Sequence, residues 1–109
     1  VVGVEPAGSA SLSGGRPGSH EIQGIGANFI PDTLNTDIYD EIIAVSDDDA
    51  FKTGREIAKT DGLLLGISSG AVLYAATVLA KSSENKGKNI IVIFPDTGER
   101  YLSTPLFKD

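Results

Sequence analysis

The alternation of apolar and polar residues predicts three β-strands along the chain. Residues 1–6 are almost continuously apolar and stop at a proline, which cannot donate a hydrogen bond to a neighbouring strand. Residues 41–45 form a second short apolar run. Residues 89–94 form a third, rich in β-branched side chains, which is typical of a central strand in a parallel sheet.

Two helices are predicted between the second and third strands. Ser46 is suited to cap the first of them, with Asp49 completing a capping box, and Gly62 is suited to end it. Apolar residues recur at helical spacing within it: Ala50, Phe51, Gly54, Ile57 and Ala58. The second helix, at about residues 69–81, is apolar nearly all round, which indicates burial on several sides. The order strand, helix, helix, strand indicates an α/β fold.

Length and composition limit the class of protein. The 109 residues have the length of one domain. The formal net charge of −6 leaves no basic surface to offset phosphate repulsion, so we expect no nucleic-acid partner and no binding to anionic membranes. Cysteine is absent, and no apolar run approaches the ~20 residues of a membrane span. A cytoplasmic protein is expected.

The beginning of the sequence suggests that the chain is a fragment. It contains no methionine, and it opens inside a predicted strand rather than in a polar terminal segment. We therefore expect residues 1–109 to belong to a longer protein.

The most suggestive chemistry lies at the start of the second helix, in the sequence Gly66-Ile67-Ser68-Ser69-Gly70-Ala71. The first N–H groups of a helix have no partner inside it and carry the positive end of its dipole. Ser68 and Ser69 can cap those groups or turn a hydroxyl toward a ligand, and Gly70 lets a ligand approach closely. The spacing predicts one wall of a pocket.

Two other motifs have simpler explanations. Gly24 and Gly26 fail the dinucleotide-binding pattern because Phe29 stands where the third glycine belongs, so a glycine-rich turn is favoured. The aspartates at 47–49 lack the glycine and the closing glutamate of a calcium loop, and we expect no metal site. They suit the first turn of a helix, where the dipole favours carboxylates.

The remaining polar candidates do not define an active site by themselves. His20 is the single histidine, and the sequence offers it no partner for base catalysis, so a loop histidine that holds backbone is favoured. Asp96, Glu99 and Arg100 could form an acid–base set, but a turn followed by an ion pair at a helix start is favoured.

Four segments carry a family resemblance when they are taken together and in order: His20–Gly26, Phe29–Pro31, Gly66–Ala71 and Pro95–Thr104. They strongly resemble the C-terminal part of cysteine synthase, also called O-acetylserine sulfhydrylase, and the resemblance covers essentially the whole sequence. It implies an α/β fold, as part of the parallel-sheet three-layer domain of the tryptophan-synthase-β-like (fold type II) pyridoxal-phosphate enzymes. Residues 1–109 would form the C-terminal part of that catalytic domain.

The resemblance implies an enzyme of cysteine biosynthesis that replaces the acetate of O-acetylserine by sulfide, with pyridoxal phosphate as cofactor. Ser68 matches the family's serine that hydrogen-bonds the cofactor's pyridine nitrogen. A neutral hydroxyl leaves this nitrogen largely unprotonated, and the milder electron sink suits β-elimination. Pro95 would line the cofactor side of the pocket. The substrate side would be formed by Gln23, Gly24, Ile25, Gly26 and Ala27.

The resemblance also implies partners and missing parts. The family tends to form homodimers and to bind the C-terminal tail of serine acetyltransferase. Its Schiff-base lysine, substrate-carboxylate loop and phosphate cup belong to its N-terminal part, so no catalytic residue is expected in this chain. The lysines of the chain match none of those motifs and are expected at the surface: Lys52, Lys59, Lys81, Lys86, Lys88 and Lys108. We expect the isolated chain to be inactive and to hold no cofactor covalently.

Departures from the family pattern leave alternatives open. Ser19 and Glu21 stand where proline and lysine are common, and Asn28 stands where glycine is common, so the charge and stiffness of this loop are undetermined. Cystathionine β-synthase and serine/threonine dehydratase share the implied fold but usually carry a different signature at the position of Ser68. A non-catalytic binding module derived from the family is the third alternative. A lysine-bearing strand and a phosphate cup before Val1 would decide for an enzyme.

Overall fold

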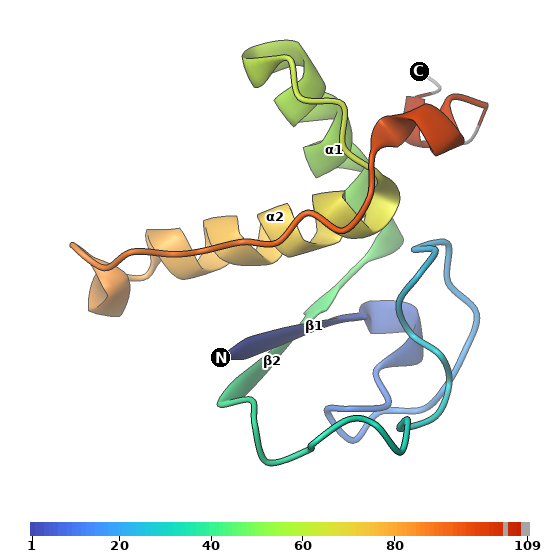
Figure 1. Ribbon diagram of the computed structural model, residues 1–109, viewed down its shortest axis with the longest axis vertical. Helices are drawn as coiled ribbons and strands as arrows, with labels where there is room; N and C mark the ends of the chain where they lie inside the picture. Colours follow the sequence, from blue (N-terminus) through green and yellow to red (C-terminus); the bar gives the residue numbers. More distant parts are fainter. Residues whose placement is uncertain (104, 108–109) are drawn as a thin grey trace.

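A two-stranded parallel sheet forms the base of the fold. The computed structural model describes residues 1–103 and 105–107. Strand β1 spans Val2–Pro6 and strand β2 spans Glu41–Val45, and the two pair in parallel over their whole length (Figure 1). The connection between them, residues 7–40, folds below the sheet and contains no helix longer than one short 3₁₀ turn. The predicted α/β class, the first strand and the second strand are confirmed.

Helix α1, Asp47–Asp61, begins and ends as its sequence predicts. The Ser46 hydroxyl accepts a hydrogen bond from the N–H of Asp49 at 3.1 Å, which is one half of the expected capping box. Gly62 follows the last turn in the left-handed conformation, with φ of 69°, where a side chain would be strained. The helix buries Ala50, Phe51 and Gly54 from its apolar stripe.

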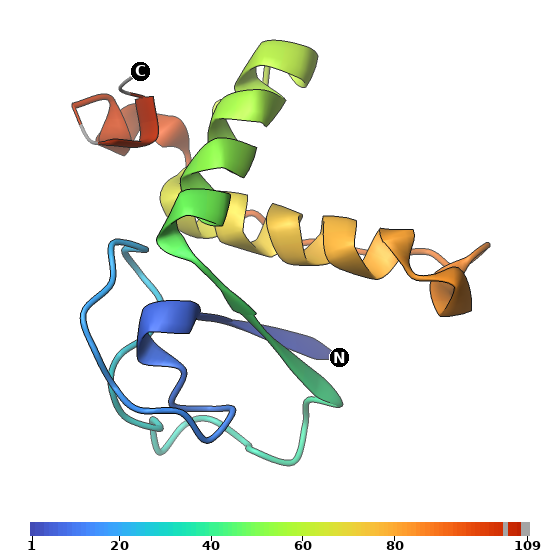
Figure 2. The ribbon, with the colours of Figure 1, turned by 180° about the vertical axis from the view of Figure 1, so that it is seen from behind.

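Helix α2, Ile67–Lys81, starts two residues earlier than predicted and crosses beneath α1 (Figure 2). Gly70 lies where the helices meet, because a Cβ there would stand 2.5 Å from the carbonyl oxygen of Ala50. The N-terminal part of α2 is buried, whereas most of its remaining residues are half-buried or exposed, including Val78. The expected burial on several sides is therefore wrong for this half of the helix within the described chain.

The predicted strand at residues 89–94 is wrong for this structure. The segment runs extended along α2 and makes no strand pairing within the described residues (Figures 1 and 2). The side chains of Ile91 and Ile93 are 92% and 79% exposed. A parallel strand exists only through hydrogen bonds to a neighbour, and β-branched composition cannot supply that neighbour.

The C-terminal residues complete the core. Leu106 is fully buried next to α1, and its carbonyl oxygen accepts a hydrogen bond of 2.7 Å from Nε of Arg55. Thr104 and Lys108 lie outside the described residues, as does the side chain of Arg100, one of the acid–base candidates. The other five lysines are exposed, as expected. Among the described helices, none is long and apolar enough to cross a membrane.

Candidate functional site

Two segments far apart in the sequence are held together at the N-terminus of α2. Leu65 and Thr97 form an isolated antiparallel bridge. On either side of it, the N–H of Gly66 donates to the carbonyl oxygen of Asp96 at 3.3 Å, and the N–H of Gly98 donates to that of Leu64 at 2.9 Å. We call residues 64–69 and 96–101 together the clasp. The clasp fixes the segment after residue 94 against the first turn of α2.

Asp96 is the centre of the clasp. Its Oδ1 accepts the Ser69 hydroxyl at 2.6 Å and the Ser69 N–H at 3.3 Å, and its Oδ2 accepts the Tyr101 hydroxyl at 2.7 Å. The N–H of Asp96 in turn donates to Oγ of Ser69 at 3.2 Å. The hydroxyl of Ser69 therefore belongs to this network and does not cap the helix, which is one of the two uses that the sequence allows for it.

The carboxylate of Asp96 serves as the missing helix cap. Gly66 occupies the N-cap position and has no side chain to offer to the first turn. Asp96 supplies an acceptor for the third N–H of the helix from 27 residues away, where the helix dipole also favours a negative charge. A Cβ on Gly66 would lie 2.1 Å from the carboxyl carbon of Asp96, so only glycine leaves room for this contact.

Sequence reasoning missed this role of Asp96, which it treated as part of a turn or an acid–base set. The only local signal is indirect. A helix that begins at a glycine requires a cap from elsewhere, and an acidic residue directly after an extended segment is a candidate for it.

Ser68 differs from its neighbour Ser69 in one respect. Both serines are buried, with 4% and 0% of their surface exposed. Whereas the Ser69 hydroxyl both donates and accepts, none of the hydrogen bonds among the described residues uses the hydroxyl of Ser68. A Cβ added to Gly24 would lie 4.0 Å from Oγ of Ser68, which brings the glycine-rich loop next to this hydroxyl. The Ser68 hydroxyl thus lies beside the glycine-rich loop with no hydrogen-bond partner among the described residues.

His20 fixes the shape of the loop that reaches Ser68. Its Nδ1 accepts a hydrogen bond of 3.1 Å from the N–H of Ile22, so the proton lies on Nε2, which donates to the carbonyl oxygen of Gly26 at 3.0 Å. Ile22 is completely buried and anchors the loop in the core. The expectation that His20 holds backbone is confirmed.

The predicted substrate residues lie on this loop. Gln23, Gly24 and Ala27 are exposed, and Ile25 packs partly buried against the core. Gly24 to Ala27 border a cavity whose other walls are mostly apolar, with Leu12 and Phe29 among them. Gln23 and Ser68 are not part of its lining. Pro95 is exposed and stands directly before Asp96, at the entrance of the clasp. The structure therefore brings Gly24 and Ser68 together and sets Pro95 at the edge of the same helix mouth.

The part of the connection that precedes this loop is held in place by hydrogen bonds to other residues of the chain. The carboxylate of Glu5 is buried and accepts the N–H groups of Leu12 and Ser13 at 2.8 and 2.9 Å. Ser9 donates to Oδ1 of Asn28 at 2.6 Å. Asn28 has φ of 66°, a conformation that asparagine tolerates better than most residues, which explains how it can stand where glycine is common.

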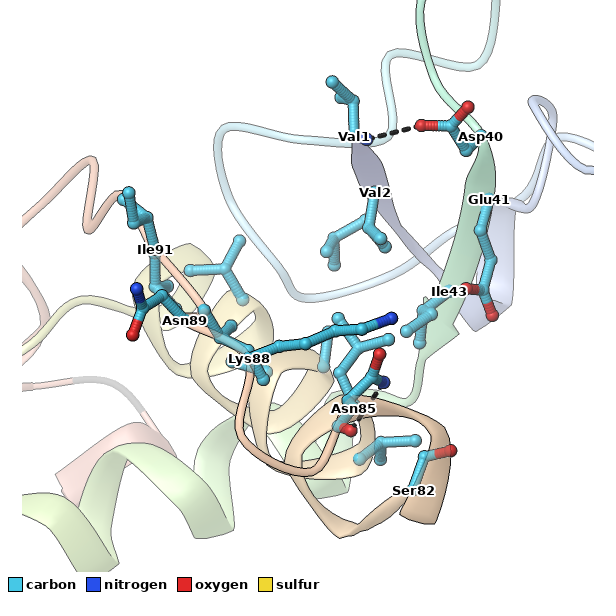
Figure 3. Close-up of a pocket in the computed structure, with 18 of the residues that line it drawn as sticks. Val1, Val2, Asp40, Glu41, Ile43, Ser82, Asn85, Lys88, Asn89 and Ile91 are labelled. Atoms are coloured by element: carbon cyan, nitrogen blue, oxygen red, sulfur yellow. Dashed lines mark hydrogen bonds and ion pairs between the residues drawn. The ribbon is translucent and has the colours of Figure 1, made fainter.

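An open groove lies away from the clasp. It runs between β1, α2 and the extended residues 88–93 (Figure 3). None of the predicted site residues lines this groove. In the part of the chain that the structure describes, no group of three or more histidine, aspartate or glutamate side chains could hold a metal ion.

Comparison with known proteins gives one consistent relationship. The family model described as "Pyridoxal-phosphate dependent enzyme" matches residues 1–96. A cysteine synthase of Staphylococcus aureus is 55% identical over 107 residues, which are 98% of this chain and 34% of that protein.

Two solved structures extend the relationship to the fold. The crystal structure of cysteine synthase from Entamoeba histolytica matches all of this chain and 33% of its own, with a TM-score of 0.97 and 49% identity. The O-acetylserine dependent cystathionine β-synthase from Helicobacter pylori matches with a TM-score of 0.85 and 44% identity, over 98% of this chain and 34% of its own. The chain thus spans about a third of the length of the relatives it matches.

Proposed function

The chain belongs to the family of pyridoxal-phosphate dependent enzymes, and we propose that the protein containing it is a cysteine synthase, a transferase that makes cysteine from O-acetylserine and sulfide. The resemblance seen in the motifs is confirmed by relatives of that name at 55% and 49% identity, and the fold type is that of its structural neighbours. The activity of the whole protein is our inference, because the chain corresponds to about a third of those relatives.

The unengaged hydroxyl of Ser68 is the observation that carries the proposal. Pyridoxal phosphate supplies an electron sink when it is bound, and its pyridine nitrogen needs a partner in the protein. A neutral serine at a helix N-terminus, with 4% of its surface exposed and its hydroxyl free of bonds to the described residues, fits that requirement. The adjacent Gly24 has φ of 96° and no side chain, so its backbone leaves the hydroxyl accessible.

The other residues of the predicted site would position the substrate and border the cofactor. Gln23 to Ala27 form the substrate side, with His20 holding the loop in one conformation through its two backbone contacts. Pro95 would border the cofactor ring, held there by the clasp that begins at the next residue. The fit of Gly24 beside Ser68 supports this arrangement.

The remaining two thirds of the protein would complete both the sheet and the site. In our proposal, residues 1–109 are the C-terminal part of the catalytic domain, and the rest of the polypeptide supplies the Schiff-base lysine, the phosphate cup and further strands. The free edge of β1, the groove beside it and the exposed Ile91 and Ile93 support this proposal, because they leave apolar surface uncovered. A homodimer, the tail of serine acetyltransferase as partner and a cytoplasmic location are further parts of the proposal, which rest on the family resemblance.

An O-acetylserine dependent cystathionine β-synthase is the second candidate, favoured by the similarity to the Helicobacter pylori structure. The two activities differ in the nucleophile. Assaying the full-length protein with O-acetylserine and either sulfide or homocysteine decides between them. A higher kcat/KM with sulfide supports the cysteine synthase, and product formation with neither nucleophile, with cofactor bound, would contradict both.

Replacing Ser68 tests the cofactor contact directly. We expect Ser68→Ala in the full-length protein to weaken binding of pyridoxal phosphate about fivefold, the value of one net hydrogen bond. Titration of the apoprotein, followed by cofactor fluorescence, measures this. Ser83→Ala, an exposed serine beyond the other end of α2, is the matched control and should leave the affinity unchanged. Equal affinities of both variants and the parent would rule the contact out.

The isolated 109-residue chain should neither catalyse the reaction nor hold the cofactor covalently. The reason is that its described lysines are all solvent-exposed, and Lys88, which borders the groove beside β1, matches none of the family's lysine motifs. Borohydride reduction after incubation with pyridoxal phosphate, followed by mass spectrometry, should give no stoichiometric single-site adduct. The full-length protein, treated in parallel, should gain one. A single modified lysine in the isolated chain would contradict the prediction.

A further inference from the structure

We propose that Asp96 is a positioning residue for Ser68: through the clasp it holds the first turn of α2 so that the Ser68 hydroxyl stays free for the cofactor. This inference rests on the proposed function and assigns a role to a residue outside the predicted site. Asp96 itself needs no contact with the cofactor, since both of its carboxylate oxygens already accept hydrogen bonds from Ser69 and Tyr101.

The first step of the inference is that Ser68 is fixed from both sides. The preceding side chain, Ile67, is 1% exposed and belongs to the hydrophobic core. The following residue, Ser69, is tied to Asp96 through both its N–H and its hydroxyl. Ser68 therefore has little freedom of its own, and its position depends on whether these two neighbours keep theirs.

The second step concerns what happens to the turn without the carboxylate. Ser69 is completely buried, so its N–H would be left without an acceptor in a place that water does not reach, and its hydroxyl would keep only the backbone carbonyl oxygen of Asp96, at 3.0 Å. Leaving such groups unpaired is costly, and the turn would shift to satisfy them. Serine side chains near helix starts readily bond local backbone, so a shifted turn would also let the hydroxyl of Ser68 engage the chain instead of a ligand.

The third step is that the carboxylate is itself held in one orientation. Tyr101 donates to Oδ2 at 2.7 Å, which prevents the group from rotating away from Ser69. Gly66 leaves the space that the carboxylate fills. Tyr101 and Gly66 thus hold the carboxylate of Asp96 in place. Through Ser69, these three residues support the contact between Ser68 and the cofactor, although none of them makes that contact itself.

A double-mutant cycle on cofactor affinity tests the inference in the full-length protein. Asp96→Ala should weaken binding of pyridoxal phosphate about fivefold, no more than Ser68→Ala does, because it acts through the same hydrogen bond. The double variant should bind like Ser68→Ala alone, since a lost contact cannot be lost again. Asp61→Asn, which removes an exposed carboxylate at the end of α1 and outside the clasp, should have no effect.

The results of the cycle distinguish the positioning role of Asp96 from the proposed contact between Ser68 and the cofactor. Losses that multiply in the double variant would show that Asp96 acts independently of Ser68 and would overturn the inference. An unchanged affinity in Asp96→Ala, together with a loss in Ser68→Ala, would also overturn it while leaving the proposed function intact. An unchanged affinity in Ser68→Ala would overturn the cofactor contact and the inference together.

A second variant covers the case in which Asp96→Ala does not fold. Asp96→Asn keeps one oxygen acceptor for Ser69 and has nearly the same shape, so it should preserve the fold and lose about twofold in affinity. That loss should also vanish in the Ser68→Ala background. A twofold loss that persists there would count against the positioning role.

Discussion

Gly66→Ala is expected to destabilise the protein by about 3 kcal/mol, a large effect for the addition of one methyl group. The new Cβ would stand 2.1 Å from the carboxyl carbon of Asp96, a distance at which one of the two groups must move. If Asp96 turns away, the N–H of Ser69 is left buried without its acceptor, which alone costs roughly 1–3 kcal/mol. Urea unfolding of the full-length protein measures the loss.

The control for Gly66→Ala is the same substitution made in a variant that lacks the Asp96 carboxylate. In an Asp96→Ala variant the obstructing carboxylate is absent, so adding Gly66→Ala should cost less than about 1 kcal/mol more. The cost of the alanine is thereby assigned to the contact between Gly66 and Asp96 and not to helix propensity. A similar cost in both backgrounds would contradict this account of the clasp.

The elements that the sequence predicts correctly are those with local signals. The cap at Ser46 acts on Asp49, three residues away, and Gly62 ends its helix by its own backbone conformation. Strand β2 has a short apolar run, and it finds its partner in the other strand that the apolar pattern predicts. His20 bonds to groups two and six residues away, so its role as a backbone holder was also within reach of local reasoning.

The features that sequence reasoning could not supply depend on distant neighbours. The extended residues 89–94 have strand-forming side chains but no strand beside them in the described chain. The cap of α2 comes from Asp96, whose distance of 27 residues hides it from any pattern based on spacing. For the same reason the sequence does not separate Ser69 from Ser68 as a capping residue, and the difference between the two adjacent serines emerges only from their hydrogen bonds. The contact of Gly24 with Ser68 likewise joins two motifs that the sequence separates.

The loop opposite Ser68 is as sensitive to added volume as the clasp. Gly26 has φ of 66°, and a Cβ there would lie 2.5 Å from both Nε2 of His20 and Cγ of Pro6. Gly26→Ala therefore combines backbone strain of about 1–2 kcal/mol with a steric clash that also threatens the hydrogen bond from His20. We expect a loss of about 3 kcal/mol or more in unfolding free energy.

The same substitution should act on catalysis, because the loop from Gln23 to Ala27 forms the substrate side of the proposed site. A displacement of about 1 Å in a positioning segment can cost up to about a hundredfold in rate, so we expect kcat/KM for O-acetylserine to fall at least tenfold. Gly14→Ala is the matched control: its φ of 86° gives the same kind of strain, but no atom lies within 4 Å of the added Cβ. It should cost only about 1–2 kcal/mol and leave kcat/KM unchanged. If both variants lost activity equally, backbone strain anywhere in the long connection would be sufficient, and the specific role of the contact between His20 and Gly26 would be refuted.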